Sequence, residues 1–97
     1  MTYFTLDTDG KTPIELPEGV YPDNETDHKI ARDVLPNGKV VSTIFLTLDH
    51  NHIGGEPILF ETMVFPTIEN FTDLDGDRYT SHELAIAGHS RLVKEHS

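Results

Sequence analysis

The stretch VLPNGKVVSTIFLTL, residues 34–48, predicts the fold more directly than any other part of the chain. Asn37 and Gly38 lie between two apolar runs, and an Asn-Gly pair in that position is a strong signal for a tight β-hairpin turn. In residues 39–48, successive side chains divide between two faces: Val40, Ile44, Leu46 and Leu48 share one with Ser42, and Val41 and Phe45 share the other with Thr43 and Thr47. This period of two, rich in β-branched residues, favours a half-buried strand. We therefore expect an antiparallel hairpin whose arms are residues 30–35 and 39–48.

A second apolar run, residues 58–65, predicts another strand of the same sheet. Its side chains alternate between two faces, one formed by Ile58, Phe60 and Val64 and the other by Leu59, Met63 and Phe65. Apolar residues on both faces predict a central strand that is covered on each side, at least in part. Glu61 lies within this run, and a carboxylate there needs a partner such as Arg32 or Lys39 on a neighbouring strand.

The segments around these runs contain mostly turn and loop signals. Residues 3–6 are typical of a short strand that ends at an Asp-Gly turn. Three prolines in residues 12–27 exclude a continuous helix or a central strand, so we expect an acidic loop there, with a brief strand at residues 14–16. Residues 67–79 are polar, and we expect them to form a loop with residues 75–77 at its tip.

The final segment predicts a helix with a defined start. Thr80 followed three residues later by Glu83 matches a capping box, in which each side chain accepts a hydrogen bond from a free backbone N–H of the other residue. The stripe expected to face the sheet comprises Leu84, Ala85, Gly88 and Leu92. Gly88 would permit a close approach to the sheet. Strands followed by one helix indicate an α+β fold, in which a small antiparallel sheet of hairpins carries a C-terminal helix.

Length and composition indicate a single domain formed by residues 1–97. The chain has no cysteine, which excludes disulfides and thiolate metal sites. It has no apolar run near the roughly 20 residues of a membrane-spanning helix, and its first residues lack the basic and apolar regions of a secretory signal. We therefore expect a cytoplasmic monomer that does not contact membranes.

Charge is the most unusual property of the sequence. Seventeen acidic and seven basic side chains give a formal charge of −10, and no Lys or Arg occurs in residues 12–28 or 49–77. Either the acids imitate a nucleic acid, or they only keep a small domain soluble. Carboxylates at alternate positions of an extended chain lie about 6.6 Å apart, roughly twice the ~3.4 Å between phosphates along one DNA strand. The candidate partner-binding residues are Asp23, Glu25, Asp27, Glu69, Asp73, Asp75 and Asp77. The chain itself is not expected to bind nucleic acid.

Two segments contain ligand-like residues without matching a metal motif in full. Residues 73–78 begin like a calcium loop, but an arginine occupies the place of the turn glycine, and Glu83 falls one residue before the bidentate position. Residues 49–52, Asp-His-Asn-His, would place two imidazoles on one face if extended. The favoured interpretation has no catalytic residue, metal or cofactor. The alternative is a metal-dependent enzyme that uses Asp49, His50, Glu61 or His89.

Three stretches of the chain resemble a family of small proteins encoded by bacteriophages and prophages. Residues 42–50 resemble a T-x-F-L-G-L-D-H strand, residues 59–65 match L-F-E-T-M-V-F, and residues 79–89 resemble the helix start Y-S-T-W-E-E-A-x-x-G-H. The chain departs from the family at Thr47, where the family usually has Gly, and at His82, where it usually has Trp. The resemblance covers about half of the chain and implies a phage origin.

In size, acidity and lack of cysteine, the chain is also similar to anti-CRISPR inhibitors, including acidic DNA mimics that act on type I-F CRISPR systems. This similarity implies binding to the positively charged DNA-binding subunits of the crRNA-guided surveillance complex in the bacterial cytoplasm, which would block target duplex binding. The alternative is a phage accessory protein that binds another host or virion protein through its sheet or helix, with the acids only solubilising the chain.

Overall fold

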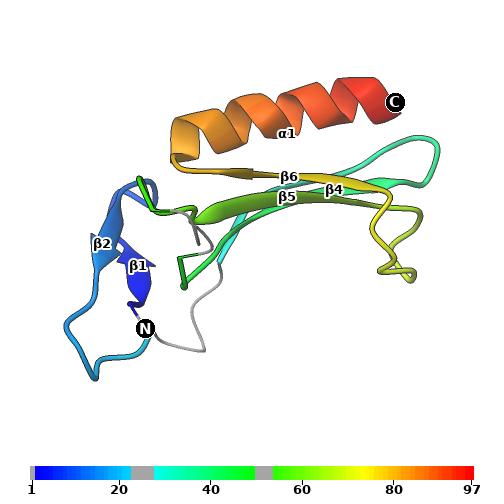
Figure 1. Cartoon of the computed structure of the whole chain (residues 1–97). Coiled ribbons are helices and arrows are strands. Elements are labelled where there is room, and N and C mark those ends of the chain that lie inside the picture. The colour runs from blue at the N-terminus through cyan, green and yellow to red at the C-terminus, as the bar shows by residue number, and fades with distance from the viewer. Residues whose placement is uncertain (1, 23–27, 50–53) are drawn as a thin grey trace.

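A four-stranded antiparallel sheet lies under a single C-terminal helix in the computed structural model, as Figure 1 shows. The structure describes residues 2–22, 28–49 and 54–97. In chain order the elements are β1 (Phe4–Leu6), β2 (Pro13–Glu15), β3 (Lys29–Val34), β4 (Val40–Phe45), β5 (Phe60–Phe65), β6 (Asp75–Tyr79) and α1 (His82–His96). The predicted α+β class is confirmed, with hairpins forming the sheet and the helix packed on it.

The predicted hairpin around Asn37 is present and starts the main sheet. Strands β3, β4, β5 and β6 follow one another in space as they do in sequence, and each pairs antiparallel with the next. In the first turn Gly38 has a φ of 90°, and its N–H donates to the carbonyl of Leu35 at 2.9 Å. Strand β4 ends at Phe45, earlier than expected. Leu46 still donates to the carbonyl of Leu59 at 2.6 Å, but Thr47 accepts from the N–H of Phe4 at 2.8 Å and so bonds to the N-terminal segment.

The expectation of a loop over residues 67–79 is wrong in its second half. Residues 75–79 form β6, the edge strand that completes the sheet against β5. Its sequence, Asp-Gly-Asp-Arg-Tyr, lacks the apolar pattern of a strand. This strand lies at the edge of the sheet and, of its five side chains, only that of Tyr79 is buried. Gly76 also serves the pairing, because a Cβ there would lie 3.1 Å from the sulfur of Met63.

Helix α1 begins one residue later than expected. Ser81, in an extended conformation, is the N-cap, and its Oγ accepts a hydrogen bond from the N–H of Leu84 at 3.1 Å. The predicted stripe is wrong at Leu84, which is 53% exposed. The buried residues of the helix are Ala85, Gly88, His89 and Leu92. Small residues face the sheet because the helix lies close to it, and a Cβ at Gly88 would overlap the ring of Tyr79.

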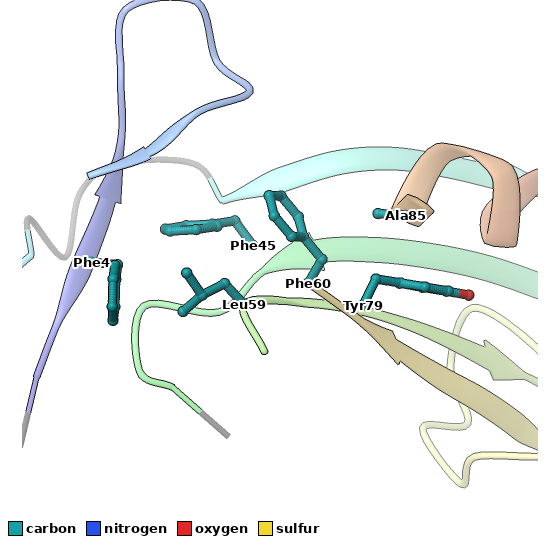
Figure 2. Packing of buried hydrophobic residues seen from close by; sticks show 6 residues of the cluster. All are labelled: Phe4, Phe45, Leu59, Phe60, Tyr79 and Ala85. Carbon is teal, nitrogen blue, oxygen red and sulfur yellow. The ribbon is translucent and has the colours of Figure 1, made fainter. Parts of the chain in front are cut away.

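The core forms where the sheet, the helix and the N-terminal strands meet. Figure 2 shows its larger cluster, which contains Phe4, Phe45, Leu59, Phe60, Tyr79 and Ala85. The rings of Phe45 and Phe60 pack edge to face with centroids 5.5 Å apart. A second cluster lies toward the other end of the helix and contains Leu35, Val41, Val64 and Leu92. Phe4 thus ties the β1–β2 hairpin to the main sheet.

Candidate functional site

The two faces of the main sheet differ in what covers them. On β4 and β5, the side chains that face α1 are buried, and those that face away are mostly half-buried. The buried set is Val41, Thr43, Phe45, Phe60, Thr62 and Val64. The outward set, which we call the open face together with the loop of residues 66–74, includes Ser42, Ile44, Glu61, Met63 and Phe65. That loop lies on the side of the sheet away from α1 (Figure 1).

The acidic residues of β6 bind the helix. The Nε2 of His96 lies 3.0 Å from an oxygen of Asp75, and the guanidinium of Arg91 donates to Asp77 at 3.1 Å. The hydrogen bond from His96, with a second from the backbone N–H of Gly76, lowers the pKa of the Asp75 carboxyl below its ordinary value. Both carboxylates therefore have partners within the molecule. Their role as partner-binding acids stays a prediction.

The other predicted acids lie elsewhere. Asp23, Glu25 and Asp27 lie outside the described residues. Glu69 and Asp73 lie in the loop between β5 and β6 and are exposed. Neither carboxylate has a hydrogen-bond or ion-pair partner within the part of the chain that the structure describes. Of the four predicted acids that the structure describes, Asp75 and Asp77 bind α1, whereas Glu69 and Asp73 lie exposed in the loop before β6.

A buried chain of hydrogen bonds joins the sheet to the helix. The hydroxyls of Thr62 and Thr43 are hydrogen-bonded, Thr43 Oγ1 lies 2.7 Å from Nδ1 of His89, and Nε2 of His89 lies 2.7 Å from a carboxylate oxygen of Asp33. A neutral imidazole with its proton on Nε2 satisfies this order, since it donates to Asp33 and accepts from Thr43. Thr62, Thr43 and His89, the buried members of this series of hydrogen bonds, then each have a partner, as burial requires.

The order hydroxyl, imidazole, carboxylate is also that of hydrolase triads, but burial argues against hydrolysis at this place. Thr43 and Thr62 are both 0% exposed, and His89 is 5% exposed. A substrate carbonyl therefore has no path to the Thr43 hydroxyl while the helix is docked. The arrangement instead fixes the position of α1 on the sheet.

The described residues that were considered as metal ligands each bind a different partner within the protein. A carboxylate oxygen of Asp49 accepts the N–H of Ile58 at 2.9 Å, which closes the connection between β4 and β5. Glu61 binds Arg78 at 2.8 Å, so the expected partners, Arg32 and Lys39, are wrong for this acid. His50 and His52 lie outside the described residues. Across residues 2–22, 28–49 and 54–97, no group of three or more His, Asp or Glu side chains could hold a metal ion.

The open face contains a pocket that the sequence analysis missed. Its volume is about 150 Å³, and its lining residues are Arg32, Val40, Ser42, Phe65, Thr67, Ile68 and Phe71. The ring of Phe71 packs edge to face on Phe65, with centroids 5.7 Å apart. Alternation in β4 and β5 was the available signal, because it assigned the side chains of each strand to two faces, but it did not show which face α1 would cover. Nothing in the sequence indicated that Ile68 and Phe71 would lie over the sheet.

Comparison of the chain with models of known protein families, with curated proteins and with solved structures finds no match. No helix within the described residues is long and apolar enough to cross a membrane.

Proposed function

We propose that this chain is a non-enzymatic binding protein of phage origin that recognises another protein through the open face of its sheet. The observation that supports this proposal is a group of exposed apolar side chains at one end of that face. Val34 is 58% exposed, Ile68 54%, Phe71 75% and Leu74 50%. Grouped apolar side chains of this kind mark interaction surfaces on small soluble proteins.

The topology explains why these four side chains gather. Val34 pairs with Val40, and Val40 pairs with Phe65, so the three form one row across the sheet. Leu74 comes directly before β6, whose first residue pairs with β5. Ile68 and Phe71 lie in the loop that connects β5 to β6, on the same side of the sheet.

The covered face cannot serve in this way without unfolding, because α1 occupies it. The outer surface of α1 also exposes apolar residues, Leu84 at 53% and Ile86 at 40%. These two are two positions apart on a helix and therefore point in different directions. The open face and its loop expose four large apolar side chains, whereas α1 exposes these two.

Selection from a library of random displayed peptides tests this proposal. Purified full-length chain should enrich peptides, and the double substitution Ile68→Asp and Phe71→Asp should abolish their binding. The matched control, Leu84→Asp and Ile86→Asp on the helix, should leave binding unchanged. If no enriched peptide depends on the open face, the proposal is wrong.

A second candidate function is mimicry of DNA by the acids, directed at the type I-F CRISPR surveillance complex. The charge of −10 and the unpaired carboxylates of Glu69 and Asp73 favour it. These acids would compete with target duplex for lysine- and arginine-lined subunits and speed association at low salt. Target-duplex binding by the purified complex should then weaken when the protein is added. Unchanged DNA affinity would overturn this candidate.

Charge neutralisation separates the two functions. The double variant Glu69→Gln and Asp73→Asn keeps the open face intact and removes two of the free carboxylates. Peptide binding through the open face should survive this change. Binding to a DNA-binding complex should weaken, more strongly at low salt than at high salt.

A further inference from the structure

The pocket on the open face has the size of one apolar side chain. An apolar cavity of about 150 Å³ is large enough to hold a benzene ring, and this pocket has a volume of about 150 Å³. Its floor includes Val40, which is only 3% exposed, so the pocket reaches the buried layer of the sheet. Ile68 and Phe71 form its rim, and a bound side chain would remove their exposed apolar surface from water.

A cation lies at the edge of this apolar pocket. Arg32 pairs with Ser42 in the register of β3 and β4, and both residues line the pocket. Within the described residues, the guanidinium of Arg32 has no carboxylate within ion-pair distance and no side-chain hydrogen bond. The two arginines outside the pocket differ in this respect, since Arg78 binds Glu61 and Arg91 binds Asp77 and Glu95.

We infer that this pocket binds an apolar side chain, aromatic or branched, that lies next to a carboxylate in a segment of a partner protein. The side chain enters between Phe65, Ile68 and Phe71, and the carboxylate accepts hydrogen bonds from the guanidinium of Arg32. Arginine suits this role because its fork of N–H donors matches the two oxygens of a carboxylate. The inference rests on the proposed binding function of the open face and names the chemistry that this face selects.

A second copy of this chain is a poorer occupant. Each copy carries a formal charge of −10, so two copies repel each other at low salt. Self-association through the pocket would have to overcome that repulsion with one arginine and one side chain. The partner is therefore a different protein whose binding segment carries its carboxylate beside the apolar residue.

A larger hollow elsewhere on the molecule does not offer the same combination. It has a volume of about 630 Å³ and lies between the β1–β2 turn and the start of α1. Its lining includes Lys11, His82 and Ile86, and none of its lining residues is buried. An apolar group bound there would gain no contact with the core, whereas the pocket on the open face ends on Val40.

A titration followed by NMR tests the inference with a defined probe. N-acetyl-L-phenylalanine carries a benzyl side chain beside a carboxylate, and it is added to the ¹⁵N-labelled full-length chain. We expect shifts at the signals of Arg32, Phe65, Ile68 and Phe71. N-acetyl-L-phenylalanine amide lacks the carboxylate, and N-acetylglycine lacks the ring, so each should bind at least about fivefold more weakly, the scale set by one charge-assisted hydrogen bond or one buried ring.

Substitutions assign the two halves of the probe to the two parts of the pocket. Arg32→Met should weaken binding of the acid to the level of the amide, while the control Lys94→Met on the outer side of α1 should leave it unchanged. Ile68→Gln should weaken the acid and the amide alike, and it supplies a second variant in case Arg32→Met alters the spectrum of the whole chain.

Several outcomes would overturn the inference. Equal affinity for acid and amide, no effect of Arg32→Met, no shifts at all, shifts confined to the hollow at Lys11, or self-association of the chain at this face would each do so. The proposed function is tested separately by peptide selection. If selected peptides depend on the open face but the probe does not distinguish acid from amide, only the pocket assignment fails.

Discussion

The face of the sheet under α1 and the face opposite to it differ in how many of their side chains are covered by other parts of the molecule. Under the helix, a buried imidazole has partners at both nitrogens, and two acids of β6 bind basic side chains of α1. On the open face, apolar side chains are exposed and Arg32 has no carboxylate partner among the described residues. The number of acids in the sequence therefore says less about function than the face on which each one lies.

The largest loss of stability is expected from a substitution that pushes α1 away from the sheet. Gly88→Val would place side-chain atoms where the ring of Tyr79 lies, and a valine gains little helix propensity over glycine to compensate. We expect the free energy of unfolding to fall by about 3 kcal/mol, the upper range for overpacking a core. Urea denaturation followed by circular dichroism measures it.

Two further variants check the cause of this loss. Ala87→Val lies next to Gly88 on the exposed side of α1, and it should cost only a few tenths of a kcal/mol. Adding Tyr79→Leu to Gly88→Val removes the overlapping ring atoms and should restore part of the lost stability, as coupled neighbours do. A Gly88→Val variant as stable as the wild type would show that α1 does not lie as close to Tyr79 as the structure places it.

A smaller effect should follow from removing one buried hydroxyl. Thr43→Val keeps the shape of the side chain, but it leaves Nδ1 of His89 and the hydroxyl of Thr62 without their partner. Unpaired buried polar groups cost about 1–3 kcal/mol each, so we expect a loss of about 2 kcal/mol after partial relaxation. Ser42→Ala, on the open side of the same strand, should change the free energy of unfolding by less than about 0.5 kcal/mol. Equal losses in the two variants would contradict the difference between the faces.

The sequence allowed the strands with strong alternation to be predicted, and the reason is physical. The hairpin at Asn37 and the central strand β5 are encoded by local signals: turn chemistry, period-two patterning and β-branched residues. Strand β6 is not encoded by such local signals. It forms because it pairs with β5 at the edge of the sheet, and its own residues have little strand propensity. The burial of Ala85 and Gly88 in place of Leu84 likewise depends on the ring of Tyr79 beneath the helix.

The structure also shows what several residues within the stretches 42–50, 59–65 and 79–89 do in the fold. Thr43, Thr62 and His89 form the buried hydrogen bonds, Tyr79 and Gly88 pack against each other, and Asp49 closes a loop. These roles stabilise the fold. Sequence reasoning could not predict these contacts, because the residues are up to 46 positions apart and meet only in the folded chain. The pocket at Arg32 lies largely outside these stretches.

Acidification should reveal the contact that holds the end of α1. The pKa of Asp75 is lowered from 3.8 chiefly by the hydrogen bond from His96. A carboxyl whose pKa is lower in the folded state stabilises the fold above its unfolded pKa, and this contribution disappears as the pH falls through the folded value. Asp75→Asn should therefore be less stable than the wild type near about pH 5, and the difference should shrink below the unfolded pKa.

Urea midpoints measured over this pH range provide the check. Asp73→Asn is the matched control, since Asp73 is exposed and has no side-chain partner in the described part of the chain. Its midpoint should follow that of the wild type at every pH. A difference between Asp75→Asn and the wild type that grows on acidification would mean that the carboxylate does not stabilise the docked helix.

The smallest change in stability is expected for a substitution on the open face. Phe71 is 75% exposed, and its ring contacts Phe65 at the rim of the pocket. Phe71→Ser should alter the free energy of unfolding by less than about 0.5 kcal/mol, the usual range for surface substitutions. Under the proposed function this ring contacts the bound partner instead of the core, so the same variant should lose binding of N-acetyl-L-phenylalanine. A loss of stability as large as that of Thr43→Val would instead make Phe71 part of the core and remove the main support for a binding surface on the open face.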